Sequence, residues 1–310
     1  MHPDSNRPDG LDEMLRQAPD VLNYFTVPLA FYEDAYEMVQ DQARMPDEIG
    51  SGTLVEIFDH HFILSAGHCI NSYERKNCSF GIKKDPHFFM PERWPSKYVY
   101  QKDDGKDFGY IQIPRHEKAI FDSGNRIFLG IDRIQATNAE ELKTEADLMI
   151  LAGYPGATQH EDSGLGIYYF RLFTLTTVIE GTKINQDKNA PVGRAKKSHS
   201  FAGYIDLYVP KSGIYLDDNE SEKEIPKLAG ASGGGCWNTN IRRLKKNWKS
   251  SDIKLTGIHV GSTHETDDNN WFARENLIGN HLRLIAEDFP TIRDKIYQRW
   301  PFLKESSWAI

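Results

Sequence analysis

Short apolar segments separated by turn-forming residues dominate the chain from residue 53 onward, and this pattern most narrows the folds available to it. TLVEIF (53–58) and FILSA (62–66) flank a polar turn. Further segments of the same kind lie at 107–113, 125–134, 146–154 and 166–179. Runs like these, bounded by Gly, Pro, Asp or Asn, are typical of β-strands. Many short strands at such intervals predict an all-β barrel or sandwich.

Helices are expected at both ends of the chain. Before Pro46, apolar residues recur at helical spacing at Leu29, Tyr32, Tyr36 and Val39, which predicts a helical N-terminal extension over residues 1–47. Near the other end, apolar residues between Leu277 and Phe289 share one face of a predicted helix. The remaining residues, 291–310, are expected to form a partly helical tail.

The segment GASGGGCW, residues 230–237, places Ser232 among small residues. It fits three descriptions: the G-x-S-x-G elbow of α/β-hydrolases, the G-x-S-G-G loop that carries the nucleophile in a class of serine peptidases, or an inert glycine-serine loop. An elbow serine begins a helix, and its acid and histidine follow it in the chain. Three glycines directly after Ser232 would destabilise a helix start by roughly 1 kcal/mol each relative to alanine. The upstream chain also shows no βαβ alternation, so the elbow is rejected.

Two upstream segments bear on the choice that remains. FILSAGHCI, residues 62–70, runs from an apolar strand through small residues to His68. DFGYIQI, residues 107–113, places Asp107 directly before an alternating apolar strand. A carboxylate beside an imidazole fixes its tautomer and stabilises the cation formed in catalysis. A lone histidine beside a strand is more often structural. Here, however, a histidine, an acid and a serine follow one another along the chain, at His68, Asp107 and Ser232.

This order resembles that of the trypsin-like serine peptidases of the chymotrypsin fold, over about residues 48–290. Two further segments, GYPG (153–156) and TGIHVGS (256–262), resemble family segments at the corresponding positions along the chain. The resemblance implies an all-β fold of two six-stranded antiparallel barrels. The first would span residues 48–135 and the second 136–276, followed by a closing helix at 277–290.

The resemblance also implies a role for each site residue. Ser232 would be the nucleophile, His68 the general base and then the general acid, and Asp107 the residue that orients His68. The backbone N–H groups of Gly230 and Ser232 would form the oxyanion hole, where losing one donor typically costs about 10²–10³ in rate. No cofactor is implied. A metal site at His60, His61 and His68 is not expected, because adjacent histidines on a turn are usually exposed.

The strand TGIHVGS is similar to the pocket strand of the glutamyl endopeptidases (V8-like), which cut after acidic residues. It is also similar to that of the viral 3C-type peptidases, which cut after glutamine. His259 would donate to a carboxylate or carboxamide oxygen of the P1 residue. Ser262 matches a further hydroxyl residue found in the pocket of the glutamyl endopeptidases. Lys227 stands at the base-of-pocket station, where it would favour an anion or point to solvent. An acidic P1 residue is expected, with a Gln-like residue as the alternative.

Two positions depart from the secreted digestive members. Ala231 stands where those enzymes carry an aspartate that pairs with a newly formed N-terminal amine, so activation by that ion pair is not expected. Cys69 has no cysteine before it with which to form the bridge usual in those members. With three cysteines in all and no secretory pattern in the first residues, we expect thiols in a reducing cytoplasm.

Charge and hydropathy narrow the expected partners. The formal net charge of -8 argues against a nucleic-acid partner, which requires a basic surface. The local basic cluster at residues 242–246 is interpreted as a solvated hairpin. No apolar stretch approaches the roughly 20 residues of a membrane span, so no membrane partner is expected. The expected partner is a protein or peptide substrate, and residues 1–47 could dock a regulatory partner.

The sequence therefore predicts a cytoplasmic serine endopeptidase that acts through an acyl-enzyme. The alternative is a catalytically silent or partner-gated protein-binding module on the same fold.

Overall fold

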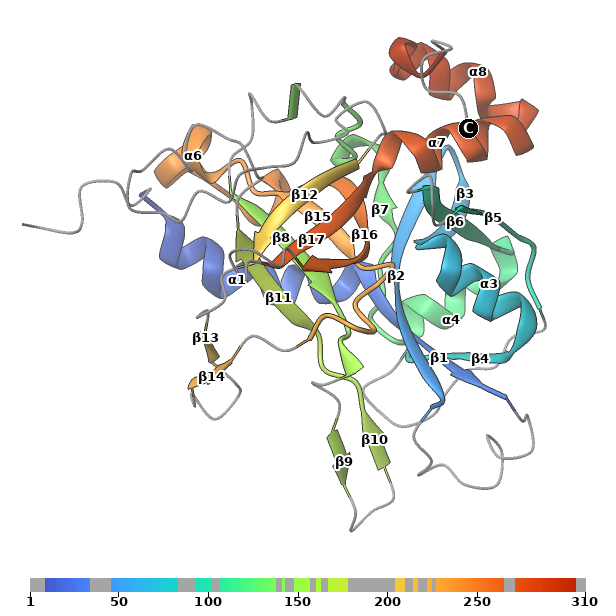
Figure 1. Ribbon diagram of the computed structural model, residues 1–310. Helices are drawn as coiled ribbons and strands as arrows, with labels where there is room; N and C mark the ends of the chain where they lie inside the picture. Colours follow the sequence, from blue (N-terminus) through green and yellow to red (C-terminus); the bar gives the residue numbers. More distant parts are fainter. Residues whose placement is uncertain are drawn as a thin grey trace, which may run out of the picture.

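Two sheets built mainly of antiparallel strands lie side by side, with helices at both ends of the chain (Figure 1). The computed structural model describes residues 9–33, 46–82, 93–101, 106–137, 141–142, 148–156, 160–162, 167–177, 204–209, 214–216, 222–224, 227–264 and 271–304.

The first sheet has seven strands: β1 (Thr26–Tyr32), β2 (Glu48–Ile57), β3 (His60–Ser65), β4 (Asn77–Phe80), β5 (Ser96–Gln101), β6 (Lys106–Ile113) and β7 (Leu129–Gly130). They follow the order β4-β1-β2-β3-β6-β5, and β7 pairs with β2 in parallel. Phe58 and Asp59 form the turn between β2 and β3 with φ of 49° and 67°. Positive φ at both turn residues matches the twist of a tight hairpin. The predicted hairpin at 53–66 is therefore confirmed.

The second sheet has six strands: β8 (Met149–Gly153), β11 (Phe173–Thr177), β12 (Tyr204–Val209), β15 (Gly235–Asn238), β16 (Lys254–His264) and β17 (Trp271–Leu277). Their order is β11-β8-β15-β16-β17-β12. Two short hairpins stand apart, β9 (His160–Asp162) with β10 (Ile167–Tyr169), and β13 (Ile214–Leu216) with β14 (Glu222–Glu224).

The mainly β architecture agrees with the sequence, but two closed six-stranded barrels are not confirmed. The first sheet has seven strands, and within the described residues no ladder joins the two ends of either sheet. The segment 125–134, expected as one strand, contributes only β7 before a 3₁₀ turn at Ile131–Arg133. The Arg133 guanidinium donates to the carbonyls of Ser250 and Ile253, which ties this segment to the chain that precedes β16.

The N-terminal segment is not wholly helical as predicted. Helix α1 spans Leu11–Phe25 and gives way to β1, which contains Leu29 and Tyr32. Strand β1 pairs with β2 on one side and with β4 on the other, and all its residues are buried. Pro28 would also be costly inside a helix. The first sheet therefore begins at Thr26 rather than near residue 48; Tyr36 and Val39 lie outside the described residues.

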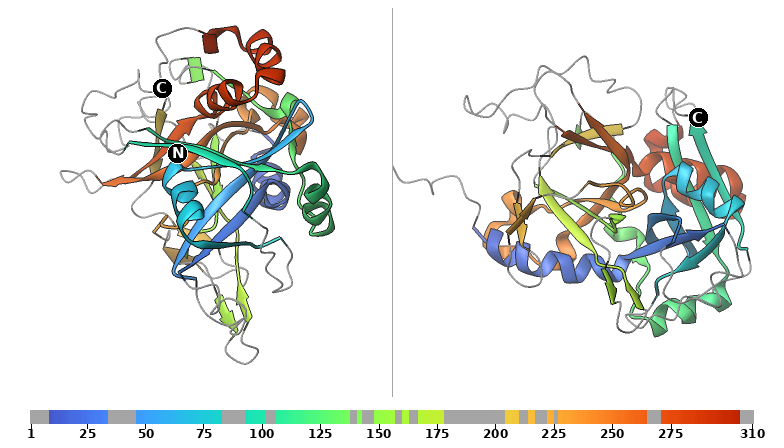
Figure 2. Two further views of the ribbon diagram at one scale, coloured as in Figure 1. Left: turned by 90° about the vertical axis from the view of Figure 1, so that its right-hand side faces the viewer. Right: turned by 60° about the horizontal axis from the view of Figure 1, so that its bottom comes forward.

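Helix α1 packs against the second half of the molecule while β1 enters the first sheet. Its buried residues, Met14, Ala18, Leu22 and Phe25, recur at helical spacing and join a core cluster with Trp237. The rings of Phe25 and Trp237 lie 6.0 Å apart. Figure 2 shows α1, in blue, along the second sheet and β1 continuing away from it. The N-terminal segment thus links the two sheets.

The chain ends in helices α7 (Ile278–Asp288) and α8 (Pro290–Arg299) and a 3₁₀ turn. The buried face of α7 includes Ile278, His281, Leu282 and Ile285, as its spacing predicts. The basic cluster lies on helix α6 (Ile241–Leu244) and a 3₁₀ turn, so the predicted hairpin is wrong there. In the described part of the chain, no helix combines the length and apolar character that a membrane crossing requires.

Candidate active site

His68 lies at the start of helix α3 (Gly67–Arg75), directly after strand β3. Gly67 makes this placement possible. A Cβ on Gly67 would lie 2.3 Å from the Val99 carbonyl oxygen and 3.0 Å from the Phe108 nitrogen. The bare backbone therefore lets the start of α3 press against strands β5 and β6, where Asp107 is located.

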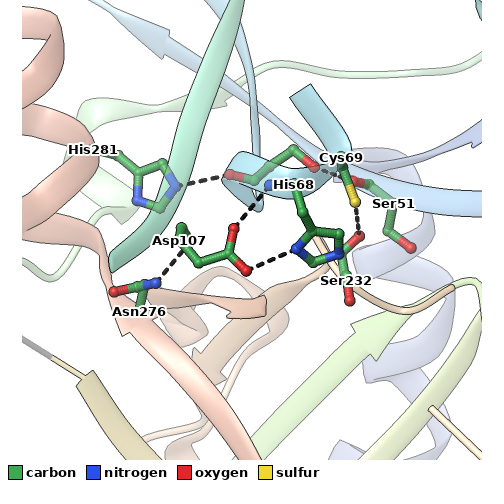
Figure 3. A network of polar contacts seen from close by, with 8 residues as sticks. Ser51, His68, Cys69, Asp107, Ser232, Asn276 and His281 are labelled. Atoms are coloured by element: carbon green, nitrogen blue, oxygen red, sulfur yellow. Dashed lines mark hydrogen bonds and ion pairs between the residues drawn. The ribbon is translucent and has the colours of Figure 1, made fainter. Parts of the chain in front are cut away.

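Both oxygens of Asp107 bind His68 (Figure 3). The His68 backbone N–H donates to Oδ1 at 2.9 Å, and the ring Nδ1 lies 2.7 Å from Oδ2. Burial works to lower the pKa of His68, but the hydrogen bond to Asp107, the neighbouring Cys69 thiol and the negative charge of Asp107 together outweigh it and raise that pKa to about 11. The carboxylate thus fixes the ring and favours its cationic form.

Two residues that the sequence did not single out form hydrogen bonds to the backbone that carries this pair. Asn276 Nδ2 donates to the Asp107 carbonyl at 2.7 Å. His281, on α7, donates from Nε2 to the Ser65 carbonyl at 3.2 Å, at the end of the strand that leads to His68. Burial lowers the pKa of His281 to about 4, so this histidine is neutral near pH 7. The closing helix and the last strand therefore fix the positions of Asp107 and of the chain before His68.

Ser232 lies beside the edge of the His68 ring that is remote from Asp107 (Figure 3). Within the described residues no hydrogen bond joins Ser232 Oγ to His68. Such bonds are often long in the absence of substrate and tighten when it binds. The structure therefore brings the three predicted residues together, with the His68–Asp107 contact formed and the His68–Ser232 contact open.

The first two glycines after Ser232 are explained by close approaches, of Gly233 to the first sheet and of Gly234 to strand β8 of the second. Gly233 has a φ of 93°, and a Cβ there would lie 1.8 Å from the Ser51 carbonyl oxygen and 2.1 Å from Ser65 Oγ. A Cβ on Gly234 would lie 2.1 Å from the Ala152 carbonyl oxygen. The loop can therefore lie between the two sheets only without side chains at these positions.

Replacing Gly233 with alanine is expected to lower the free energy of unfolding by about 2 kcal/mol or more, because the new methyl group would overlap backbone and adopt a positive φ. Chemical denaturation measures this loss. Gly156→Ala is the matched control, since its Cβ would approach only the Ala229 oxygen, at 3.7 Å. Equal stability of the two variants would contradict the packing described for the serine loop.

The N–H groups of Gly230 and Ser232 are available to a ligand. The carbonyl of Ala229 accepts from Gly156 N–H at 2.7 Å, and that of Ala231 accepts from Gly234 N–H at 2.8 Å. In a trans peptide the N–H points opposite to the C=O, so these bonds also orient the N–H groups of the residues that follow. Among the described residues, neither of those two N–H groups donates a hydrogen bond. The Ala231 side chain is fully buried in an apolar cluster.

His259 is fully buried and forms a pair with Glu275, a residue that the sequence analysis did not identify. The two face each other across β16 and β17, and His259 Nδ1 lies 2.8 Å from Glu275 Oε1. Burial raises the pKa of Glu275, although the charge of His259 acts in the opposite direction. Within the described structure, His259 Nε2 and Glu275 Oε2 have no hydrogen-bond partner. The available signal was a carboxylate placed between Ala273 and Leu277 in the segment FARENL, residues 272–277.

The other two predicted pocket residues are placed differently. Lys227 and Ser262 are exposed, and no hydrogen bond in the described structure joins either side chain to His259. Of the three predicted pocket residues, only His259 lies in a fully buried polar environment.

The three cysteines, Cys69, Cys78 and Cys236, are buried and unpaired with one another, as expected for thiols. Burial raises the pKa of Cys78 and Cys236 well above the usual value. Cys69 lies at the site, with Sγ 3.5 Å from the Ser232 carbonyl oxygen. These thiols therefore pack as small apolar groups.

Comparisons with known proteins give a weak likeness to solved structures. No protein-family model matches the chain, and no curated protein does. A solved structure of an HtrA-type protease with a decapeptide has a TM-score of 0.40 and 8% sequence identity, covering 90% of this chain and 66% of that chain. This chain thus spans just under two thirds of that protein's length.

Proposed function

We propose that this protein is a serine endopeptidase that uses Ser232, His68 and Asp107. The observation that carries the proposal is the His68 ring, bound by Asp107 on one side, with Ser232 beside its opposite edge. A histidine oriented by a carboxylate and placed next to a serine is the arrangement that activates a hydroxyl nucleophile.

In the proposed mechanism, Ser232 Oγ attacks the carbonyl carbon of the scissile bond while His68 Nε2 takes the hydroxyl proton. The oxyanion that forms accepts hydrogen bonds from the N–H groups of Gly230 and Ser232. The intermediate collapses as the C–N bond breaks, and His68 gives its proton to the leaving amine. Water, deprotonated by His68, then attacks the acyl-enzyme and releases the acid and Ser232. Asp107 stays ionised and stabilises the imidazolium in both halves.

A second candidate is a partner-gated or catalytically silent binding module. The open contact between Ser232 and His68 favours this alternative, since a partner could be needed to close it. A fluorophosphonate probe distinguishes the two candidates: labelling of Ser232 supports the enzyme, and its absence both alone and with substrate peptide supports the module.

Three buried, unpaired thiols fit a reducing compartment, and we place the proposed peptidase in the cytoplasm.

The first experiment is cleavage of a peptide panel that varies only at P1, with wild-type protein and Ser232→Ala in parallel. We expect turnover by the wild type that is strongest with an acidic P1 residue, and none by the variant. Cleavage that survives in the variant would overturn the mechanism. A preference for Arg or Phe would overturn the pocket assignment and leave the triad in place.

The proposed acidic preference depends on His259 and Glu275. The Nδ1 side of the His259 ring faces Glu275, so Nε2 can present an N–H to a P1 carboxylate. A buried, unpartnered Nε2 is costly in the absence of substrate, and a P1 oxygen would satisfy it. Lys227 and Ser262, both exposed, would contact the substrate nearer the pocket entrance.

Replacing Glu275 with glutamine is expected to lower the ratio of kcat/KM for Glu over Gln at P1 by about tenfold, which corresponds to about 1.4 kcal/mol. Glutamine can still accept from His259 but carries no negative charge, so the charge-assisted part of the contact is lost. Glu13→Gln is the matched control, since Glu13 pairs with Arg16 on the exposed side of helix α1. An unchanged ratio in Glu275→Gln would exclude Glu275 from P1 selection.

A further inference from the structure

The hydroxyl of Ser51 connects the first sheet to the loop that carries the nucleophile. Ser51 lies in strand β2 and is fully buried. Its Oγ donates to the Gly230 carbonyl at 2.9 Å and accepts from the Tyr154 N–H at 2.8 Å. Its own backbone N–H donates to the Ser232 carbonyl at 2.7 Å. One residue of the first sheet therefore contacts both residues of the proposed oxyanion hole.

The contact on Gly230 differs in kind from those beside it. The carbonyls of Ala229 and Ala231 accept from backbone N–H groups of Gly156 and Gly234, which belong to the same half of the molecule as the loop. The Gly230 carbonyl between them accepts from a side chain of the other sheet. Gly230 has a φ of 95°, and glycine has no Cβ to hold its peptide in one orientation. The N–H of the same peptide, that of Ala231, donates to the Leu228 carbonyl at 2.8 Å, and the Ser51 hydrogen bond holds the opposite, carbonyl side of the peptide.

We propose that Ser51 is a positioning residue that holds the oxyanion hole in its catalytic shape. Its hydroxyl fixes the Gly230 carbonyl and, through Tyr154 N–H, the segment that leads to Gly156. Gly156 in turn orients the peptide whose N–H belongs to Gly230. The two N–H donors are thus oriented before substrate binds, and no newly formed N-terminal amine is required to orient them. This inference rests on the proposed peptidase function.

Loss of the hydroxyl would leave the part-buried Gly230 carbonyl and the buried Tyr154 N–H without this partner, and such groups tend to recover partners by rearrangement. Rotation of the peptide planes at Gly230 would move an oxyanion donor away from the developing charge. The effect would appear in the transition state, because the donors act on charge that develops there. Substrate binding in the ground state would change little.

The test compares Ser51→Ala with Ser79→Ala. Ser79 is also fully buried in the first sheet, in strand β4, and within the described structure its Oγ has no hydrogen-bond partner. We expect Ser51→Ala to lower kcat by about 10²-fold with KM within about twofold. Binding of a peptide aldehyde that mimics the tetrahedral intermediate should weaken by a similar factor. Ser79→Ala should keep kcat within about threefold of wild type. Equal losses in both variants would overturn the inference.

A second readout needs no turnover. Crystal structures of the two variants should show the Gly230 carbonyl moved in Ser51→Ala and unmoved in Ser79→Ala. An unmoved loop in Ser51→Ala would overturn the positioning role even if the wild type is active. A moved loop with an inactive wild type would support the role of Ser51 and count against the proposed function instead. If Ser51→Ala does not fold, Ser51→Cys takes its place, because a thiol keeps the volume and donates weakly. Its kcat should then fall between those of the wild type and an oxyanion-hole deletion.

Discussion

Replacing Ser232 with alanine is expected to lower kcat for peptide hydrolysis by about 10⁶-fold. The alanine variant has no nucleophile, and His68 and the oxyanion donors cannot form an acyl-enzyme alone. The fold should persist, because the bond between Ser51 N–H and the carbonyl of residue 232 is made by backbone. The measurement is kcat on the best peptide of the P1 panel, with a thermal melt to confirm the fold.

The double variant with His68→Ala makes this prediction sharper. Residues that act as one unit give losses that do not multiply, so Ser232→Ala/His68→Ala should be about as slow as either single variant. Multiplied losses would mean that the two residues act independently, which would contradict the triad. Ser123→Ala is the matched control: its Oγ donates only to the Ile120 carbonyl on the exposed helix α4 (Lys118–Ser123), and its rate should equal that of the wild type.

The proposed catalytic residues could be picked out from the sequence because each is tied to a local pattern. His68 follows an apolar strand and small residues, Asp107 precedes an alternating strand, and Ser232 stands in a glycine-rich loop. The contacts that orient them could not be predicted in the same way. Ser51 reaches Gly230 across 179 residues, and nothing in the sequence around either one reports the other. Long-range pairing is a property of the folded chain rather than of any window in it.

The N-terminal helix was predicted too long for a related reason. Leu29 and Tyr32 are spaced as in a helix, but every residue of β1 is buried. Periodicity marks a helix or strand by contrast between its buried and exposed faces. A strand that is covered on both faces lacks that contrast, so apolar spacing alone could not separate it from α1. Pro28 was the local signal against a continuous helix.

Replacing Asp107 with asparagine is expected to lower the plateau of kcat by about 10⁴-fold, the size that follows when the triad carboxylate becomes an amide. Asparagine can donate to Nδ1 and so favours the tautomer that carries its proton on Nε2. That tautomer cannot accept the Ser232 proton. Because Asp107 also raises the pKa of His68, its loss should lower that pKa.

This second effect has a definite sign in the pH profile. The general base must be neutral, so kcat/KM rises as pH rises through the pKa of His68. In Asp107→Asn the rising limb should therefore move to lower pH while its plateau falls. Asp122→Asn, which removes a carboxylate paired with Lys118 on α4, should leave both limb and plateau unchanged. A fallen plateau with an unmoved limb would mean that Asp107 orients the ring without setting its charge. If the limb does not move and the plateau does not fall, Asp107 is excluded from the reaction and the His68–Asp107 bond is structural.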